Sequence, residues 1–170
     1  MLNIRKGTVA DIDAVLAVYE AARSFMRANG NHNQWVGGYP AREDVLADIE
    51  AGNNYVGETE DGEIVMTFAF IIGEDPTYTV IEDGEWLNDR PYGTIHRIGT
   101  NGKRSGMMKA CTEFCFKFTD NLRLDTHRDN RTMLEAAGRL GFRRCGIIYC
   151  RDGSPRIALQ KVLEKDTFAI

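Results

Sequence analysis

Apolar residues recur at the spacing of an α-helix in four segments of the chain. The first stripe extends from Ile12 to Met26, follows a capping box at residues 8–11 and stops at Asn29-Gly30, a pair that ends helices. An equally regular stripe extends from Met107 to Phe118. The pattern therefore predicts four helices, the first ending at Asn29 and the others covering residues 41–51, 106–119 and 130–140.

Shorter segments rich in β-branched and aromatic residues lie between turn signals and predict seven strands. Asp61-Gly62 and Asp152-Gly153 are strong hairpin signals, because such two-residue turns match the twist of antiparallel strands. Residues 31–40 and 73–91 follow neither period and are expected to be irregular. The predicted strands are residues 3–6, 54–60, 63–72, 94–99, 121–126, 143–150 and 155–161.

The order of these elements, β-α-α-β-β-β-α-β-α-β-β, predicts the fold class. Strand-helix-strand units need parallel neighbours, whereas hairpins need antiparallel ones. We therefore expect an α/β (α+β mixed) fold: a single three-layer domain in which a mixed, mostly antiparallel sheet of about seven strands carries helices on both faces. No internal repeat or linker divides the chain, so residues 1–170 are expected to form one domain.

Composition excludes several classes of protein. Of the 170 residues, 43% are hydrophobic and 27% are charged, as in a globular domain. No apolar run approaches the ~20 residues that a membrane span needs, and residues 1–6 lack the apolar segment of a signal peptide, so a cytoplasmic location is expected. The net charge of -4 disfavours nucleic-acid binding. The four cysteines lack zinc-site spacing, and we expect buried, reduced thiols and no metal.

Residues 99–108, Gly-Thr-Asn-Gly-Lys-Arg-Ser-Gly-Met-Met, connect a predicted strand to a predicted helix. A Gly-rich basic turn at a helix start presents free backbone N–H groups and the positive helix end, which together bind phosphate. A Walker P-loop is excluded, because Arg97 occupies the place of its first Gly and Arg104 follows Lys103. The glycine spacing also differs from a Rossmann fingerprint. The plainer alternative is a strand-helix connection without a ligand.

Two short motifs follow one another in this half of the chain. Residues 103–108 fit the pattern Arg/Gln-x-x-Gly-x-Gly/Ala except at Lys103 and Met108. Asn130 is followed eleven residues later by Gly141-Phe142. Together with the element order, these motifs resemble the GNAT family of acetyl-CoA-dependent N-acetyltransferases, and the resemblance extends over nearly the whole chain. Residues 31–40 and 95–98 are similar to segments of bacterial members.

The resemblance implies how acetyl-CoA binds. The fourth and fifth strands splay apart, the peptide-like pantetheine arm pairs with the fourth strand at a bulge at Gly99, and Asn130 hydrogen-bonds the arm. In the plainer alternative, Asn130 is only a helix cap. A solvated rim that meets the 3′-phosphate is expected from the basic cluster Arg123, His127, Arg128 and Arg131. The expected cofactor-binding residues are Ile98, Gly99, Thr100, Lys103, Arg104, Ser105, Gly106, Met107, Met108, Asn130 and Arg131.

Acetylation of an amine needs a base, because an amine with a pKa near ~10.4 is mostly protonated at neutral pH. His96 is the preferred base, since it is the imidazole on the fourth strand. Strand alternation places it on one face with Tyr92, Thr94 and Ile98. The alternative is a packed histidine with satisfied nitrogens. A backbone N–H near Ile98 or Gly99 is expected to hold the acyl carbonyl. Second choices for the base are Asp125, His127 and Glu20.

The general acid is harder to place. Members of the family commonly have a Tyr seven residues after the second-motif Asn, and here that position is Ala137. Tyr149 and Cys150 are the substitutes that the sequence offers, and water is the remaining source of the proton. Tyr149 is also a natural strand-packing residue. The missing tyrosine keeps a second class of function open, a non-catalytic acyl-CoA-binding or sensing module.

The acceptor is expected beneath residues 31–40, because the family places this loop over the active site. Aromatic faces and amide donors suit a small-molecule amine or an amino acid or peptide. Trp35 serves equally well as an anchor of the loop. A homodimer is compatible with the resemblance. The expected substrate-binding residues are His32, Gln34, Trp35, Tyr39, Asp125 and His127.

Overall fold

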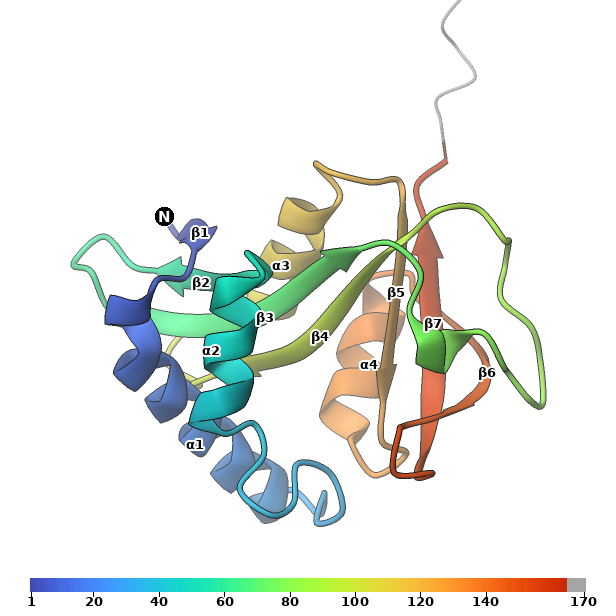
Figure 1. Ribbon diagram of the computed structural model, residues 1–170, viewed down its shortest axis with the longest axis horizontal. Coiled ribbons are helices and arrows are strands. Elements are labelled where there is room, and N and C mark those ends of the chain that lie inside the picture. The colour runs from blue at the N-terminus through green and yellow to red at the C-terminus, as the bar shows by residue number, and fades with distance from the viewer. Residues whose placement is uncertain (165–170) are drawn as a thin grey trace, which may run out of the picture.

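The computed structural model describes residues 1–164 and confirms the predicted order of elements (Figure 1). One 7-stranded sheet has the order β1-β2-β3-β4-β5-β7-β6; β4 and β5 run parallel and the other neighbours antiparallel. The elements are β1 (Asn3–Lys6), α1 (Ile12–Ala28), α2 (Arg42–Glu50), β2 (Asn54–Glu58), β3 (Ile64–Ile72), β4 (Gly93–Thr100), α3 (Met107–Cys115), β5 (Asn121–Thr126), α4 (Arg131–Arg139), β6 (Arg143–Tyr149) and β7 (Pro155–Val162).

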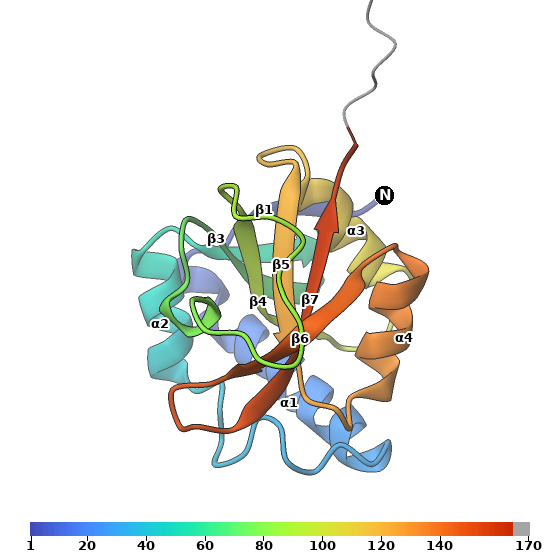
Figure 2. The ribbon, with the colours of Figure 1, turned by 90° about the vertical axis from the view of Figure 1, so that its right-hand side faces the viewer.

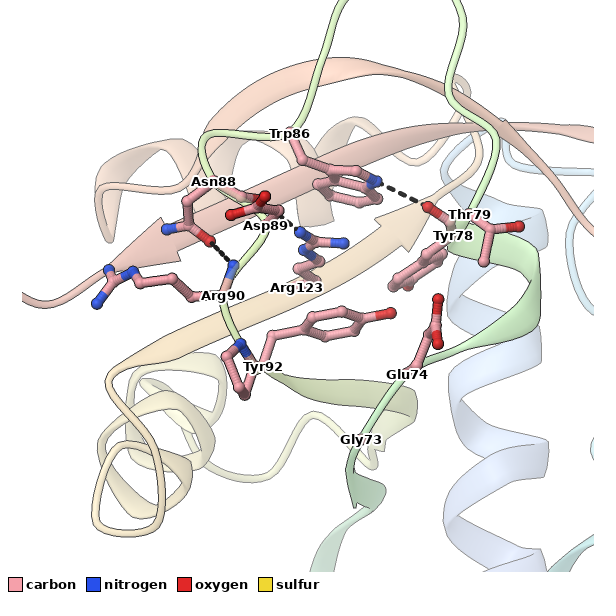
Figure 3. Close-up of a pocket in the computed structure, with 11 residues that line it drawn as sticks. Gly73, Glu74, Tyr78, Thr79, Trp86, Asn88, Asp89, Arg90, Tyr92 and Arg123 are labelled. Carbon is pink, nitrogen blue, oxygen red and sulfur yellow. Dashed lines mark hydrogen bonds between the residues drawn. The ribbon is translucent and has the colours of Figure 1, made fainter.

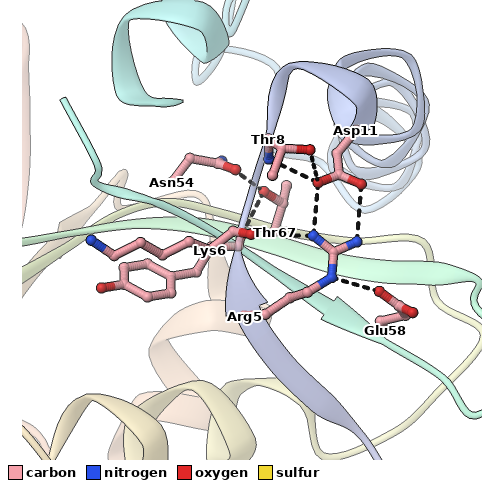
Figure 4. Close-up of polar contacts among 8 residues, drawn as sticks. Arg5, Lys6, Thr8, Asp11, Asn54, Glu58 and Thr67 are labelled. Carbon is pink, nitrogen blue, oxygen red and sulfur yellow. Dashed lines mark hydrogen bonds and ion pairs between the residues drawn. The ribbon is translucent and has the colours of Figure 1, made fainter. Parts of the chain in front are cut away.

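Helix α1 begins at the predicted capping box, within the polar cluster of Figure 4. The Asp11 carboxylate accepts hydrogen bonds from the Thr8 N–H (2.8 Å) and from the Arg5 guanidinium (2.8 and 3.0 Å). Arg5 also donates to Glu58 on β2 at 2.7 Å. The hydrogen bonds from Arg5 lower the pKa of Asp11 to about 2, against the opposing effect of burial. The cluster ties the start of α1 to β1 and β2.

The two halves of the sheet are covered in different ways. Helices α1 and α2 pack on one face of β2, β3 and β4, and α3 and α4 pack on the opposite face (Figures 1 and 2). Over β5, β7 and β6 the first face is crossed by residues 73–92, here called the 73–92 connection (Figure 2). Glu82 bridges to Ile147 on β6, and the Leu87 N–H donates to Gln160 on β7 at 2.8 Å. An irregular segment therefore takes the place of a helix.

The apolar core agrees with the helical stripes read from the sequence. On the α3 and α4 side, Phe68, Leu122 and Leu134 belong to one buried cluster, and on the α1 and α2 side Tyr19 and Val56 belong to a second. All four cysteines are free, three of them buried and Cys150 half-buried. Among residues 1–164, no helix is long and apolar enough to cross a membrane.

Strands β4 and β5 diverge soon after they begin. Their parallel ladder joins Gly93 to Leu122 and Thr94 to Arg123, and within the described residues no further pair follows (Figure 1). Residues 95–100 of β4 therefore present a strand edge without a partner on the β5 side. This is the splay of the fourth and fifth strands that the family resemblance implied.

The bulge in β4 lies at Arg97, so the expectation that it lies at Gly99 is wrong. The register against β3 shifts between Thr67 and Ala69, and Arg97 has a φ of 51°. A non-glycine residue tolerates this conformation here because its side chain is held by Asp48. The extra residue also reverses the alternation of the residues that follow it. Ile98 therefore packs with the cluster on the α3 side, and the prediction that it shares a face with His96 is wrong.

Candidate active site

The turn between β4 and α3 carries a row of free backbone donors. Gly106 precedes α3 with a φ of 75°, in the left-handed region. Within residues 1–164 the N–H groups from Arg104 to Lys109 have no hydrogen-bond acceptor, in part because the first N–H groups of any helix have none inside the helix. Such a row at a helix start binds anions such as phosphate groups.

In the first part of the same turn, side chains of the turn itself accept hydrogen bonds from the backbone N–H groups. The Gly102 N–H donates to Thr100 Oγ1 at 3.3 Å, and the Lys103 N–H donates to Asn101 Oδ1 at 3.1 Å. The Lys103 ammonium forms an ion pair with Glu63. Lys103, expected among the cofactor-binding residues, therefore has its main donors engaged within the protein, whereas Arg104 is exposed and forms no ion pair with the described residues.

His96 lies at the start of the splay and is held by a carboxylate. Its Nε2 lies 2.8 Å from Asp75 Oδ2. Burial alone would raise the pKa of Asp75, but the hydrogen bonds from His96 and Thr77 lower it to about 2. An ionised carboxylate only accepts hydrogen bonds, so Nε2 of His96 carries the proton and donates it. Nδ1 is then the nitrogen left to accept a proton, as a base requires.

A second buried pair, Tyr78 and Asp125, lies beside His96. The Tyr78 hydroxyl donates to Asp125 Oδ2 at 2.6 Å, and its ring centroid is 6.2 Å from that of His96. Burial raises the pKa of Tyr78 well above its usual value and also raises the pKa of Asp125. The Tyr92 hydroxyl accepts from the Asp75 N–H at 2.7 Å. The sequence reading placed His96 and Asp125 here and missed Asp75 and Tyr78.

One local signal for the missed residues was available. Asp75 followed by Pro76 is the start of a short 3-10 helix, in which Asp75 accepts from the Thr77 N–H at 2.8 Å. Three residues are too short a segment for hydrophobic periodicity to register. The contacts to His96 and Asp125 join residues far apart in the sequence, and these no local pattern predicts.

Residues 31–40 lie at the C-terminal end of β5, whereas the parallel ladder lies at the start of β4 and β5. The Gln34 Oε1 accepts hydrogen bonds from Asn31 (3.0 Å), Asn130 (3.3 Å) and Thr126 (3.4 Å). The Asn130 Oδ1 in turn accepts from the Met133 N–H at 3.2 Å and caps α4. Both side chains, expected to face ligands, are engaged with the protein in this structure. The loop thus bridges α1 and the end of β5.

The other residues of the loop have separate surroundings. Trp35 packs edge-on against Tyr19, with ring centroids 5.3 Å apart, which is the anchoring role considered for it. The Tyr39 hydroxyl accepts from Arg97 at 3.0 Å. His32 is exposed. Trp35 and Tyr39 of the loop therefore pack against or bind other residues of the protein, and the loop does not present a cluster of side chains without partners.

Several expected residues lie away from His96. Tyr149 is at the end of β6, two strands beyond β5, and its hydroxyl donates to Glu82 at 2.8 Å. Cys150 follows it, and Glu20 is exposed on α1. The structure therefore does not bring the Tyr149 hydroxyl to the splay. Ala137 is buried in the core of α4, where no hydroxyl is present.

The basic cluster predicted around the end of β5 is not a single solvated rim. Arg131 is exposed at the start of α4, as expected. His127 is 8% exposed, its Nδ1 accepts from the Asp129 N–H at 3.0 Å, and burial lowers its pKa. Arg123 is 5% exposed and points into the interior beneath the 73–92 connection. Alternation along β5 places Arg123 on the same face as Asp125, and this face is covered.

Comparison with known proteins was made by sequence and by structure. No protein-family model and no curated protein sequence matches the chain. Among solved structures, a GNAT-family acetyltransferase from Streptococcus agalactiae is 34% identical over 96% of each chain, with a TM-score of 0.85. A GNAT-family acetyltransferase from Listeria monocytogenes is 21% identical over 95% of each chain, with a TM-score of 0.71.

More distant structures share the fold. The ribosomal-protein-S18-alanine N-acetyltransferase of Escherichia coli is 15% identical, with a TM-score of 0.62, over 100% of this chain and 99% of that one. The sheet splayed between β4 and β5, the donor row before α3 and the close similarity to the streptococcal protein agree with one another. On these grounds the chain belongs to the GNAT family of acetyltransferases.

Proposed function

We propose that the protein is an acetyl-CoA-dependent N-acetyltransferase that acts by direct attack of an amine on the bound thioester. One observation carries the proposal: the row of free N–H groups from Arg104 to Lys109 continues directly from the unpaired edge of β4. The first suits a diphosphate and the second suits a peptide-like arm. Few ligands combine both groups, and CoA is one of them.

The residues present fit this ligand in order along the chain. The N–H groups from Arg104 to Lys109 would hold the diphosphate, and the exposed Arg104 guanidinium adds positive charge. Residues 95–100 would pair with the arm, and a backbone N–H near Ile98 or Gly99 would hold the acyl carbonyl. The bound co-substrate supplies an activated acyl group, and the protein supplies position and a proton path.

His96 would take the proton that the amine loses. Asp75 keeps Nε2 protonated, which leaves Nδ1 to accept the proton from the attacking nitrogen. Asp75 also stabilises the imidazolium that forms, as a carboxylate beside a histidine does. Because Tyr149 lies elsewhere and position 137 is Ala, we propose that the same imidazolium returns the proton to the departing sulfur, directly or through water.

Calorimetric titration with CoA and with acetyl-CoA tests the binding step. Arg104→Glu should weaken binding about tenfold, because it replaces an attractive charge at the anion site by a repulsive one. Arg151→Glu is the matched control, since Arg151 is also exposed and lies in the distant turn between β6 and β7. Binding weaker than millimolar for both ligands, or equal effects of the two variants, would overturn the proposal.

Release of free CoA in the presence of a panel of amines tests the chemical step. The expected result is amine-dependent release that His96→Gln lowers by about 100-fold without changing CoA affinity. Binding without release for any amine would favour the non-catalytic acyl-CoA-binding module, for which the buried alanine at position 137 is the favouring observation.

A further inference from the structure

A cavity of about 730 Å³ lies beneath the 73–92 connection (Figure 3). Tyr78, which lines it, donates a hydrogen bond to Asp125. Its buried floor is formed by Tyr78, Tyr92 and Arg123, with Trp86 half-buried above them. Its exposed rim includes Glu74 and Asp89. A cavity of this size accommodates a small organic molecule.

Arg123 is a buried cation without a counterion in the described part of the protein. It is 5% exposed, and no carboxylate of residues 1–164 forms an ion pair with it. Its Nη2 donates to the Asn88 carbonyl at 2.8 Å, while its buried Nε has no partner. A buried charge is costly unless it is paired. The guanidinium therefore has unused capacity to bind an anion.

The surroundings of Arg123 select the shape of that anion. The guanidinium carbon lies 4.2 Å from the ring centre of Trp86 and 3.9 Å from that of Tyr92 (Figure 3). Because both faces of the guanidinium plane are covered, an anion reaches its edge, and the planar fork of a carboxylate matches that edge. The apolar ring surfaces suit an organic acid rather than an inorganic ion.

The rim adds a second requirement. Glu74 and Asp89 are exposed carboxylates without ion-pair partners among the described residues, whereas Arg90 is engaged by Asp120 at 3.6 Å. The entrance is therefore negative and the floor positive. Negative charge at the entrance attracts a molecule that also carries an ammonium group during its entry, and it repels a phosphate dianion.

The cavity adjoins the proposed active site through a shared side chain. Arg123 is the ladder partner of Thr94, and His96 lies two residues further along β4 on the same face. Tyr78 lines the cavity, donates to Asp125 and has its ring 6.2 Å from that of His96. We propose that Arg123 binds the carboxylate of the acceptor, so that the acceptor is a small molecule of the amino-acid class; this rests on the proposed function.

Matched pairs of acceptors test the assignment. L-lysine and 1,5-diaminopentane, and L-phenylalanine and phenethylamine, differ by the carboxylate alone. We expect kcat/KM to favour each amino acid over its amine by about tenfold or more, with the difference mostly in KM, as a charged hydrogen bond supplies. Arg123→Met should abolish the preference and leave CoA affinity unchanged, and Arg123→Lys should retain part of it.

The control variant is Arg139→Met, which removes one positive charge on α4, on the opposite face of the sheet. It should keep the preference for the amino acids. If CoA binds and amines are acetylated but Arg123→Met has the same preference as the unchanged protein, the carboxylate site is wrong and the proposed function stands.

Calorimetry with the same four compounds gives a readout that does not depend on turnover. Binding of L-phenylalanine that is lost in Arg123→Met supports the site even if CoA does not bind, in which case the proposed function alone fails. Equal binding of L-phenylalanine and phenethylamine, or no binding of either amino acid, overturns the assignment of Arg123.

Discussion

Two arginines on adjacent strands, the half-buried Arg97 and the buried Arg123, have opposite surroundings. Arg97 on β4 donates to both oxygens of Asp48 at 2.9 and 2.6 Å and to the Tyr39 hydroxyl at 3.0 Å. Arg123 on β5 is more deeply buried, yet it has two aromatic rings in place of a carboxylate. The first guanidinium is paired within the protein, whereas the second has no counterion among residues 1–164 and is the one that we assign to a ligand.

The cover of each strand explains the difference. Asp48 on helix α2 and Tyr39 on the preceding loop both reach Arg97. The 73–92 connection lies over β5 and brings Trp86 and Tyr92, leaving a cavity between itself and the sheet. Arg97 is therefore part of the framework, whereas Arg123 keeps hydrogen-bonding capacity that the described residues do not use.

The largest expected effect on stability comes from breaking the ion pair between Asp48 and Arg97. Asp48→Ala leaves the half-buried Arg97 without its counterion and should lower the free energy of unfolding by about 3 kcal/mol in urea denaturation. Asp13→Ala is the control, because Asp13 pairs with Arg42 at the surface, with its side chain 93% exposed, and should cost no more than about 0.5 kcal/mol. Similar losses in the two variants would show that Arg97 is not a framework residue.

The next effect comes from displacing the cover of Arg123. Gly146 has a φ of 156°, and a Cβ there would lie 2.5 Å from the Glu82 carbonyl oxygen of the connection. Gly146→Ala should cost about 2–3 kcal/mol in the same denaturation experiment and increase the solvent exposure of Trp86, measured by its emission. Gly153→Ala has nothing near its Cβ and should cost only about 1 kcal/mol, through its positive φ. Equal costs would mean that the connection is not pinned to β6.

The contact between Asp75 of the 73–92 connection and His96 of β4 gives a smaller effect on stability, which depends on pH. The pKa of Asp75 is lowered to about 2, so its contribution to stability is present above its usual value and is lost as the pH falls from about 4 to 2. The stability difference between the unchanged protein and Asp75→Asn should therefore shrink from about 2 kcal/mol at pH 6 towards zero at pH 2. A difference that is constant with pH would contradict an ionised Asp75 that accepts a hydrogen bond from His96.

The smallest effect is expected at Arg123 itself. Arg123→Met removes a cation that has no counterion in the described residues and keeps a side chain between the two rings, so the free energy of unfolding should change by no more than about 1 kcal/mol. Arg97→Met, measured alongside, should cost about 3 kcal/mol because it leaves Asp48 unpaired. If Arg123→Met is as destabilising as Arg97→Met, the two arginines have the same structural role and the comparison fails.

Most of the fold follows from patterns that lie within short stretches of the sequence. The stripes from Ile12 to Met26 and from Met107 to Phe118 fix two helices, and the two Asp-Gly turns fix two hairpins. These features depend on local spacing and turn chemistry, which the sequence displays directly. The free donors before α3 follow from the Gly-rich turn for the same reason.

The candidate site depends on contacts that local patterns do not contain. Asp75 meets His96 across 21 residues and Tyr78 meets Asp125 across 47, and the connection that carries Asp75 and Tyr78 has no period to reveal its role. The basic neighbours of Arg123 predict a solvated rim. However, Arg123 lies between the core residues Leu122 and Leu124 on β5, and its side chain is on the opposite face of the same strand. Which segment covers its face is a property of the whole fold.

Because of the bulge at Arg97, the number of residues in β4 decides which face of the sheet each later side chain occupies. Gly99 faces α1, where a Cβ would lie 3.1 Å from the Tyr19 ring, and Ile98 faces the core on the other side. Adding one residue between Arg97 and Ile98 would exchange these two orientations and drive an isoleucine into the tyrosine. A single-residue insertion here should therefore be tolerated less well than any single substitution in the strand.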